Sequence, residues 1–143
     1  MNIEECFEKR LLRNAPPDRL KCNKALEMSD RALKQAEKLM EHGFYEQTIL
    51  YSYTSMFHGA RALLFKDGIT EKSHYCVIEY LKHNYVQSGK LNQSHIHWLD
   101  TYRIERHETL YGLENIVVNK NDAIEAVKSA ANFLNEIRRL AGD

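Results

Sequence analysis

The sequence predicts an all-α fold, an antiparallel up-and-down bundle of five or six helices. Apolar residues recur at helical spacing along most of the 143 residues, whereas the alternation typical of strands is rare. Both prolines lie side by side at Pro16-Pro17, and only six glycines interrupt the chain. The periodic segments are joined by short connections, which favours neighbouring helices that run in opposite directions.

The prolines separate the first two predicted helices. Residues 3–13 are expected to form a short helix that ends before Pro16. A longer helix is expected from residue 18 or 24 to residue 42, and Gly43 suits its C-terminal end. The residues that trace its inward face are Leu26, Ser29, Leu33, Ala36 and Met40.

The next helix is predicted over residues 44–66 and ends at Asp67-Gly68. Its apolar positions, at i, i+3, i+4 spacing, are Ile49, Tyr53, Met56, Phe57, Ala60, Leu63 and Leu64. Thr70 or Ser73 can cap a shorter helix that continues to about residue 86, and residues 87–91 form a turn.

Two further helices complete the predicted bundle, over residues 91–112 and 122–140. Asn119 or Asn121 can cap the last helix, and the arginines near its end suit the C-terminal helix dipole. The chain contains no internal repeat, low-complexity tract or linker. Residues 1–143 are therefore predicted to form a single domain.

Composition narrows the function classes. Twenty basic and twenty acidic residues cancel, so any binding to nucleic acid would need a local basic patch. The hydrophobic fraction of 43% is ordinary for a soluble domain, and no apolar stretch approaches a membrane-spanning length. Because the first residues lack the pattern of a signal peptide, we expect a cytoplasmic protein without membrane association.

Cysteine and histidine spacing gives no sign of a metal or cofactor. Cys6, Cys22 and Cys76 form an odd, scattered set without a CxxC pair, which argues against a disulfide framework and against a thiolate zinc site. His95 and His97 would point to different sides of a helix, so we expect no shared ion there. Phosphate-cradling glycine motifs are absent, and neither a metal nor a cofactor is predicted.

The helix predicted over residues 91–112 has polar groups where its apolar face should be. At about 100° per residue, its apolar arc contains Leu99, Tyr102 and Leu110. The same arc contains Asp100, Arg103, Arg106 and His107. Since burying unpaired charge is costly, this face is either incompletely buried or holds paired charges in a cleft. Both interpretations indicate a functional site.

Residues 53–64, with the sequence YTSMFHGARALL, resemble the HEPN domain family. The most similar branch comprises small, free-standing prokaryotic proteins, in which an aromatic pair precedes MFHAARALL; Gly59 stands here for one alanine. Further matches follow in the same order along residues 25–140. They are Ser73-His74, the turn at residues 85–91, and Arg106 with Tyr111, where Leu110 replaces an aspartate.

The resemblance implies an all-α, HEPN-like bundle that forms a homodimer. It also implies a small nucleotidyltransferase partner protein in a two-component, toxin–antitoxin-like system. This chain lacks the two-carboxylate motif of a nucleotidyltransferase, so that activity would belong to the partner. Active HEPN proteins are metal-independent ribonucleases with an arginine and a histidine separated by four to six intervening residues. Here Arg103 and His107 are separated by only three residues.

The spacing of Arg103 and His107 makes them neighbours on one helix face. Cleavage of RNA without metal needs a base for the 2′-hydroxyl and a cation for the phosphorane, roles that histidine and arginine can fill. The candidate catalytic residues are Arg103, Arg106 and His107. The candidate nucleotide- or RNA-binding residues are His58, Arg61, Asp100 and Tyr111.

Two other interpretations stay open at this point. The chain could be a non-catalytic module that binds a nucleotide, RNA or the nucleotidyltransferase partner. Alternatively, Asp100 pairs with Arg103, Arg106 pairs with a carboxylate or a carbonyl, and the cluster is a buried structural network or a dimer-interface network. Likewise, His58 could be a packed histidine, and Arg61 could extend along the surface to reach solvent.

Overall fold

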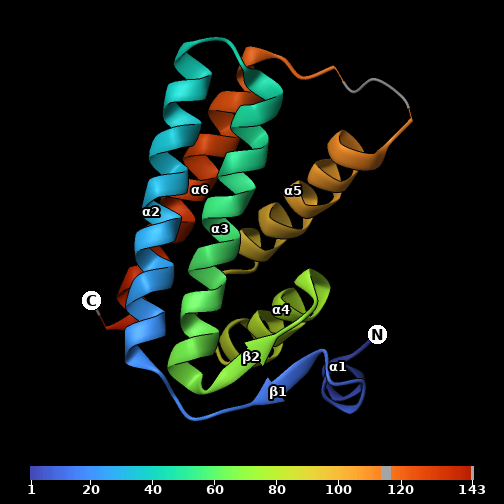
Figure 1. The fold of residues 1–143 in the computed structure, drawn as a ribbon, viewed down its shortest axis with the longest axis vertical. Coiled ribbons are helices and arrows are strands. Elements are labelled where there is room, and N and C mark those ends of the chain that lie inside the picture. Colours follow the sequence, from blue (N-terminus) through green and yellow to red (C-terminus); the bar gives the residue numbers. More distant parts are fainter. Residues whose placement is uncertain (114–116, 143) are drawn as a thin grey trace.

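The computed structural model describes residues 1–113 and 117–142, and it confirms the predicted all-α fold. Three long helices lie side by side, α2 (Arg19–Glu41), α3 (Tyr45–Asp67) and α6 (Lys120–Ala141), as Figure 1 shows. Helix α5 (Gln93–Tyr111) starts against α3 and inclines away from the other three, so that its C-terminal end stands apart from them (Figure 1).

The centre of the bundle is α3, which buries residues on several sides because α2, α4, α5 and α6 all contact it. Small side chains allow close approach to α2. The Ser29 hydroxyl donates to the Ser55 carbonyl at 2.6 Å, and the Ser55 hydroxyl donates to the Ser29 carbonyl at 2.8 Å. This reciprocal pair satisfies two buried hydroxyls and fixes the register of the two helices.

The small elements lie at one end of the bundle (Figure 1). They are α1 (Ile3–Glu8), β1 (Leu12–Asn14), β2 (Ile69–Glu71), α4 (His74–Leu81) and the π-helical turn η1 (Lys82–Val86). Strands β1 and β2 pair antiparallel, with Leu12 opposite Glu71.

The prediction of one helix over residues 3–13 is wrong beyond Glu8, where α1 ends. Asn2 caps α1, but Arg10 adopts a φ of 58°, in the left-handed region that ends a helix. Leu12 is then buried in a strand whose partner, β2, lies far along the sequence. Local periodicity could not show this pairing, since it depends on contacts between distant segments.

The remaining helix ends agree closely with the prediction. Gly43 and Gly68 both have a φ of 80°, the conformation that glycine adopts most easily after a helix. Of the predicted alternatives, Ser73 caps α4 and Asn119 caps α6, because each side chain accepts a backbone N–H of the first turn. Thr70 lies in β2 instead.

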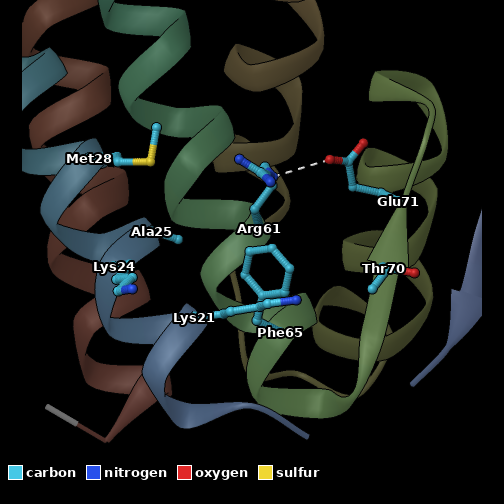
Figure 2. Close-up of a pocket in the computed structure, with 8 residues that line it drawn as sticks. All are labelled: Lys21, Lys24, Ala25, Met28, Arg61, Phe65, Thr70 and Glu71. Atoms are coloured by element: carbon cyan, nitrogen blue, oxygen red, sulfur yellow. Dashed lines mark ion pairs between the residues drawn. The ribbon is translucent and has the colours of Figure 1, made fainter. Parts of the chain in front are cut away.

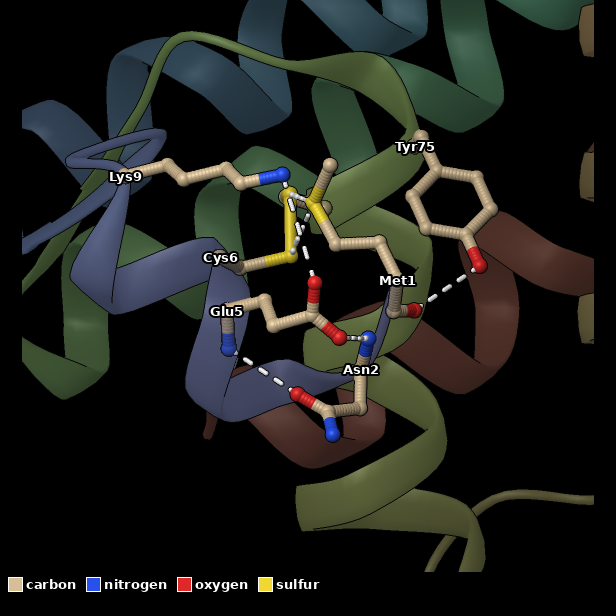
Figure 3. A network of polar contacts seen from close by, with 7 residues as sticks. Met1, Asn2, Glu5, Cys6, Lys9 and Tyr75 are labelled. Atoms are coloured by element: carbon tan, nitrogen blue, oxygen red, sulfur yellow. Dashed lines mark hydrogen bonds and ion pairs between the residues drawn. A yellow bond between two sulfur atoms is a disulfide. The ribbon is translucent and has the colours of Figure 1, made fainter.

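The expectation of no disulfide framework is wrong for one pair of cysteines. A disulfide joins Cys6 in α1 to Cys76 in α4, with the two Cα atoms 5.8 Å apart. Figure 3 shows the bond beside Met1, whose carbonyl accepts a hydrogen bond from the Tyr75 hydroxyl at 3.0 Å. The two cysteines are 70 positions apart, and only the packing of α1 on α4 brings them together.

The Asp67 carboxylate joins the end of α3 to the π-helical turn. It accepts hydrogen bonds from the hydroxyls of Tyr80, at 3.0 Å, and Tyr85, at 2.6 Å. Within the described parts of the chain, no helix has the length and apolar character needed to cross a membrane.

Candidate functional site

Helix α5 has a buried half and an exposed half. Its fully packed side chains, Ile96, Leu99 and Tyr102, all lie in the first half. Toward its C-terminal end the helix diverges from the bundle (Figure 1), and Leu110 is 48% exposed. The apolar arc predicted from the sequence is thus only partly covered, which is why it tolerates charged residues.

Asp100 and Arg103 form an ion pair near the middle of α5, as the structural interpretation predicts. The Arg103 Nε donates to the Asp100 Oδ1 at 3.0 Å, and the Arg103 guanidinium lies over the Tyr75 ring at 5.7 Å from its centroid. By contrast, Arg106 makes no hydrogen bond or ion pair with any residue in the described ranges 1–113 and 117–142. Its charge is therefore available to an anionic ligand.

His107 lies further along α5, on the exposed half. Its ring lies 5.1 Å from that of Tyr111, between centroids, and both side chains are exposed. Ile104 and Leu110, which are also exposed, lie on the same broad face of the helix. His107 is therefore surrounded by exposed apolar side chains that no described part of the chain covers.

The prediction missed His74, the first residue of α4. Its Nδ1 is 2.7 Å from the Tyr53 hydroxyl, and its ring stacks on Phe57 with centroids 3.9 Å apart and planes 7° apart. Ser73-His74 contributed to the family resemblance, but nothing in the local pattern gave the histidine a role. Its partners come from α3, about twenty positions earlier, and only the tertiary fold reveals them.

Four of the predicted site residues lie near enough to His74 to affect its pKa. Burial lowers the pKa of His74 most, the positive charges of Arg106, Arg103, Arg61 and His58 add to the effect, and together they bring it to about 4. Burial raises the pKa of Tyr53, against the influence of Arg106 and Arg103. At neutral pH the pair is therefore a neutral imidazole and a protonated phenol.

We refer to these residues as the His74 cluster. Its members are Tyr53, Phe57, His58 and Arg61 from α3, His74 from α4, and Arg103 and Arg106 from α5. His107 and Tyr111 lie outside it, toward the end of α5.

Arg61 links the cluster to β2. Figure 2 shows its side chain reaching from α3 toward Glu71, and the Nε is 3.1 Å from the Glu71 Oε1. The Nε–H is not aligned for a hydrogen bond, so the contact is an ion pair. The Arg61 Nη1 donates to the His58 Nδ1 at 3.2 Å, and the pKa of His58 is lowered, by burial first and by Arg61 second. His58 therefore accepts a hydrogen bond from Arg61 and is not only a packed aromatic side chain.

The charges of the cluster favour an anion. Asp100 and Glu71 offset two of its three guanidinium groups, and the third, on Arg106, is left without an ionic partner in the described chain. A phosphate group could accept hydrogen bonds from Arg106 at little desolvation cost, because the side chain is only partly buried. Among the described residues, no group of histidine, cysteine, aspartate and glutamate side chains could hold a metal ion.

Comparison with known proteins identifies the class of this helical domain. The sequence model of the HEPN domain matches residues 23–140, and the chain belongs to the HEPN family. It is 31% identical over 108 residues to UPF0332 protein PH1297 of Pyrococcus horikoshii, a match that covers 76% of each chain. It is 23% identical over 116 residues to a protein of Methanocaldococcus jannaschii named "Putative toxin MJ0142", covering 81% of this chain and 78% of that one.

Proposed function

We propose that this protein is the HEPN component of a two-component, toxin–antitoxin-like system, and that it cleaves RNA without a metal ion. Membership of the HEPN family supports the first part, as does the name of the Methanocaldococcus jannaschii relative. The observation that carries the second part is the Arg106 guanidinium, which has no ionic partner among the described residues. It lies next to an exposed histidine, on a half of α5 that the described chain leaves uncovered.

In this proposal a homodimer completes the site. Ile104, Leu110 and Tyr111 surround His107, and a second copy that covered these apolar side chains would bring two His107 rings close together. Burying such an exposed apolar surface is the usual driving force for association. Two histidines would then supply the general base and the general acid that RNA cleavage requires.

The reaction follows from these roles. One His107 takes the proton of a 2′-hydroxyl, and the 2′-oxygen attacks the adjacent phosphorus. The bond from phosphorus to the 5′-oxygen breaks, and the second histidine gives a proton to the leaving oxygen. The products are a 2′,3′-cyclic phosphate and a free 5′-hydroxyl. Arg106 and Arg103 stabilise the charge on the phosphorane, while His58, Arg61, Asp100 and Tyr111 position the RNA.

The test is cleavage of a labelled RNA by the purified protein in EDTA, compared with His107→Ala and Arg106→Ala. Loss of general acid–base catalysis should slow cleavage by about 10²–10⁴-fold in His107→Ala, with an unchanged circular dichroism spectrum. His42→Ala, at an exposed histidine on α2's C-terminal cap, is the control and should cleave at the wild-type rate. Equal rates for His107→Ala and wild type would refute the catalytic proposal.

A second candidate function is a non-catalytic module that binds RNA, a nucleotide or a small nucleotidyltransferase partner. The ion pair between Arg103 and Asp100 favours it, because that arginine is already engaged. This candidate predicts no RNA cleavage by the wild-type protein. It also predicts that a small nucleotidyltransferase partner copurifies with the wild type and is lost with Arg106→Glu.

A further inference from the structure

A second basic surface lies on the other side of α3, along its contact with α2. Each helix contributes residues at the same spacing, i, i+3, i+7, i+10 and i+14, which places them in one stripe. The α2 stripe is Lys21, Lys24, Met28, Arg31 and Gln35, and the α3 stripe is Tyr51, Thr54, His58, Arg61 and Phe65. Fourteen residues of helix extend about 21 Å, so the two stripes line one long surface.

This surface is hollowed. A cavity of about 420 Å³ lies at the Lys21 end, between α2 and β2 with α3 as its floor, and Figure 2 shows its lining. A second cavity, of about 310 Å³, lies between α2 and α3 toward Tyr51. Met28 lines both, so the two cavities adjoin. We call this continuous feature the α2–α3 groove.

The charge of the α2–α3 groove is strongly one-sided although the whole chain is neutral. Its cationic side chains are Lys21, Lys24, Arg31 and Arg61, and its one carboxylate, Glu71, is paired with Arg61. Two of the acidic residues of α2, Glu27 and Asp30, face elsewhere and line a different cavity beside Arg138. In the described chain, Lys21, Lys24 and Arg31 have no ion-pair partner. The groove therefore suits a polyanion.

Aromatic rings stand at both ends of the groove. Tyr51 is exposed at one end, where a flat ligand can stack on it. At the other end Phe65 carries two cations, the Lys21 Nζ at 5.8 Å and the Arg61 guanidinium at 5.2 Å from its centroid. In Figure 2 these two side chains lie on opposite sides of the Phe65 ring. Basic and aromatic side chains along one groove are the combination that single-strand-binding proteins use.

The width of the groove selects between single and double strands. Helices in direct contact pack with their axes about 8–10 Å apart. A DNA duplex is wider than this spacing, because its major groove alone measures about 12 Å across. It would therefore contact only the two edges of the α2–α3 groove. An extended single strand can enter it, and about 21 Å is comparable with the shortest known sites, of about four nucleotides.

We infer that the α2–α3 groove binds the sugar–phosphate backbone of a single-stranded nucleic acid. His58 and Arg61 belong both to the groove and to the His74 cluster, so a strand in the groove is led toward α5. The inference rests on the proposed function for the identity of the strand as RNA substrate. The binding itself does not depend on cleavage.

The experiment is fluorescence anisotropy with a labelled 12-nucleotide RNA, the same sequence as DNA, and the corresponding duplexes. The test variant is Lys24→Gln with Arg31→Gln. The matched control is Lys34→Gln with Lys128→Gln, which removes the same net charge from positions outside the groove. The His107→Ala background prevents degradation of the RNA during the measurement if the protein is an RNase.

We expect the single strands to bind more tightly than the duplexes. The test variant should lose about ten-fold or more in affinity, and its slope of log K against log salt should fall by about 1.4, for two lost phosphate contacts. The control pair should bind like its parent. Tyr51→Ala should weaken binding with little change in the salt slope, since stacking releases no counterions.

Three results would overturn the inference. They are equal losses in the test and control pairs, equal affinity for duplex and single strand, and binding only to acidic proteins with no affinity for RNA or DNA. Failure of the proposed function is distinguishable from these, because wild type would then bind RNA through the groove without cleaving it. Cleavage that survives in the test variant at saturating RNA, with a raised KM only, also supports the groove as a binding site.

Discussion

At the scale of single residues, His74 shows how the bundle controls a titratable group. The imidazole is stacked on Phe57, hydrogen-bonded to Tyr53 and faced by His58 and Arg61 from α3 and by Arg103 and Arg106 from α5. Burial and these cations together oppose a positive charge on the ring. His74 therefore serves as a neutral hydrogen-bonding partner at neutral pH, and it leaves the cationic role to the arginines.

This neutrality predicts that the protein loses stability in mild acid. In the unfolded chain the pKa of a histidine is about 6.5, and in the folded protein the pKa of His74 is about 4. Between these values the unfolded state binds more protons, so the free energy of unfolding should fall as pH falls from about 6.5 to about 4. Urea unfolding at several pH values, with His74 followed by NMR, measures both quantities.

The comparison variant is His74→Gln, which keeps a polar side chain but does not titrate. Its free energy of unfolding should depend less on pH than that of the wild type across this window. A His42→Gln variant should keep the wild-type dependence, because His42 lies at the exposed end of α2. A His74 pKa near 6.5 in the folded protein would contradict the prediction.

The candidate residues of α5 were predictable from the sequence because they share one helix. Asp100, Arg103, Arg106 and His107 all fall in an arc where apolar side chains were expected, so helical geometry alone pointed to them. His74 and the basic stripe of α2 could not be found in this way. Their importance depends on which helix lies opposite, and that is a property of the tertiary fold.

At the scale of elements, α3 depends on small side chains where it meets α2 and α6. Gly59 lies at this crossing, yet the space around it is not full. A Cβ added there would lie 3.5 Å from the Ile137 Cγ1, 3.5 Å from the Ser29 Oγ and 3.7 Å from the Phe133 ring. These are ordinary contact distances, so an alanine fits without displacing its neighbours.

Gly59→Ala should therefore stabilise the protein by about 0.5–1 kcal/mol, because alanine loses less backbone entropy than glycine in a helix interior. Urea unfolding measures the difference. Gly68→Ala is a sharp contrast, since that residue has a φ of 80° and an added Cβ would lie 2.5 Å from the Ala15 carbonyl oxygen. It should destabilise the protein. A loss of stability in Gly59→Ala would show that the helices cannot accommodate one methyl group at this crossing.

The long helices were predictable because each carries a continuous periodic face and a recognisable cap. The segment from residue 9 to residue 14 lacks both. Its path depends on the left-handed turn at Arg10, the pairing of β1 with β2 and the disulfide between Cys6 and Cys76. Each of these contacts involves residues far apart in sequence or a backbone conformation that no glycine signals.

At the scale of the whole molecule, the inclined helix α5 leaves the bundle incomplete. Leu110 and Tyr111 extend beyond the packed part of the molecule and expose apolar surface on the same face as His107. If this face is the interface of a homodimer, as we propose, assembly and catalysis are linked, because the residues that hold the subunits together also surround the reacting histidine.

The expected result is a dimer of the wild-type protein at micromolar concentrations and a folded monomer for Ile104→Glu with Leu110→Glu. Burying two unpaired carboxylates of each subunit in an apolar interface is more unfavourable than the remaining apolar contacts are favourable. Light scattering coupled to size exclusion measures the mass, and circular dichroism checks the fold. The monomer should also lose RNA cleavage, although its Arg103, Arg106 and His107 are intact.

The control is Leu20→Glu, which places a carboxylate at an apolar residue that is 64% exposed on α2, away from α5. It should remain dimeric and active. A wild-type protein that is monomeric at high micromolar concentration would contradict the dimer, and so would a Leu20→Glu variant that dissociates as readily as the α5 variant. In the first case, cleavage by the monomer would require His107 to act with a group on its own chain.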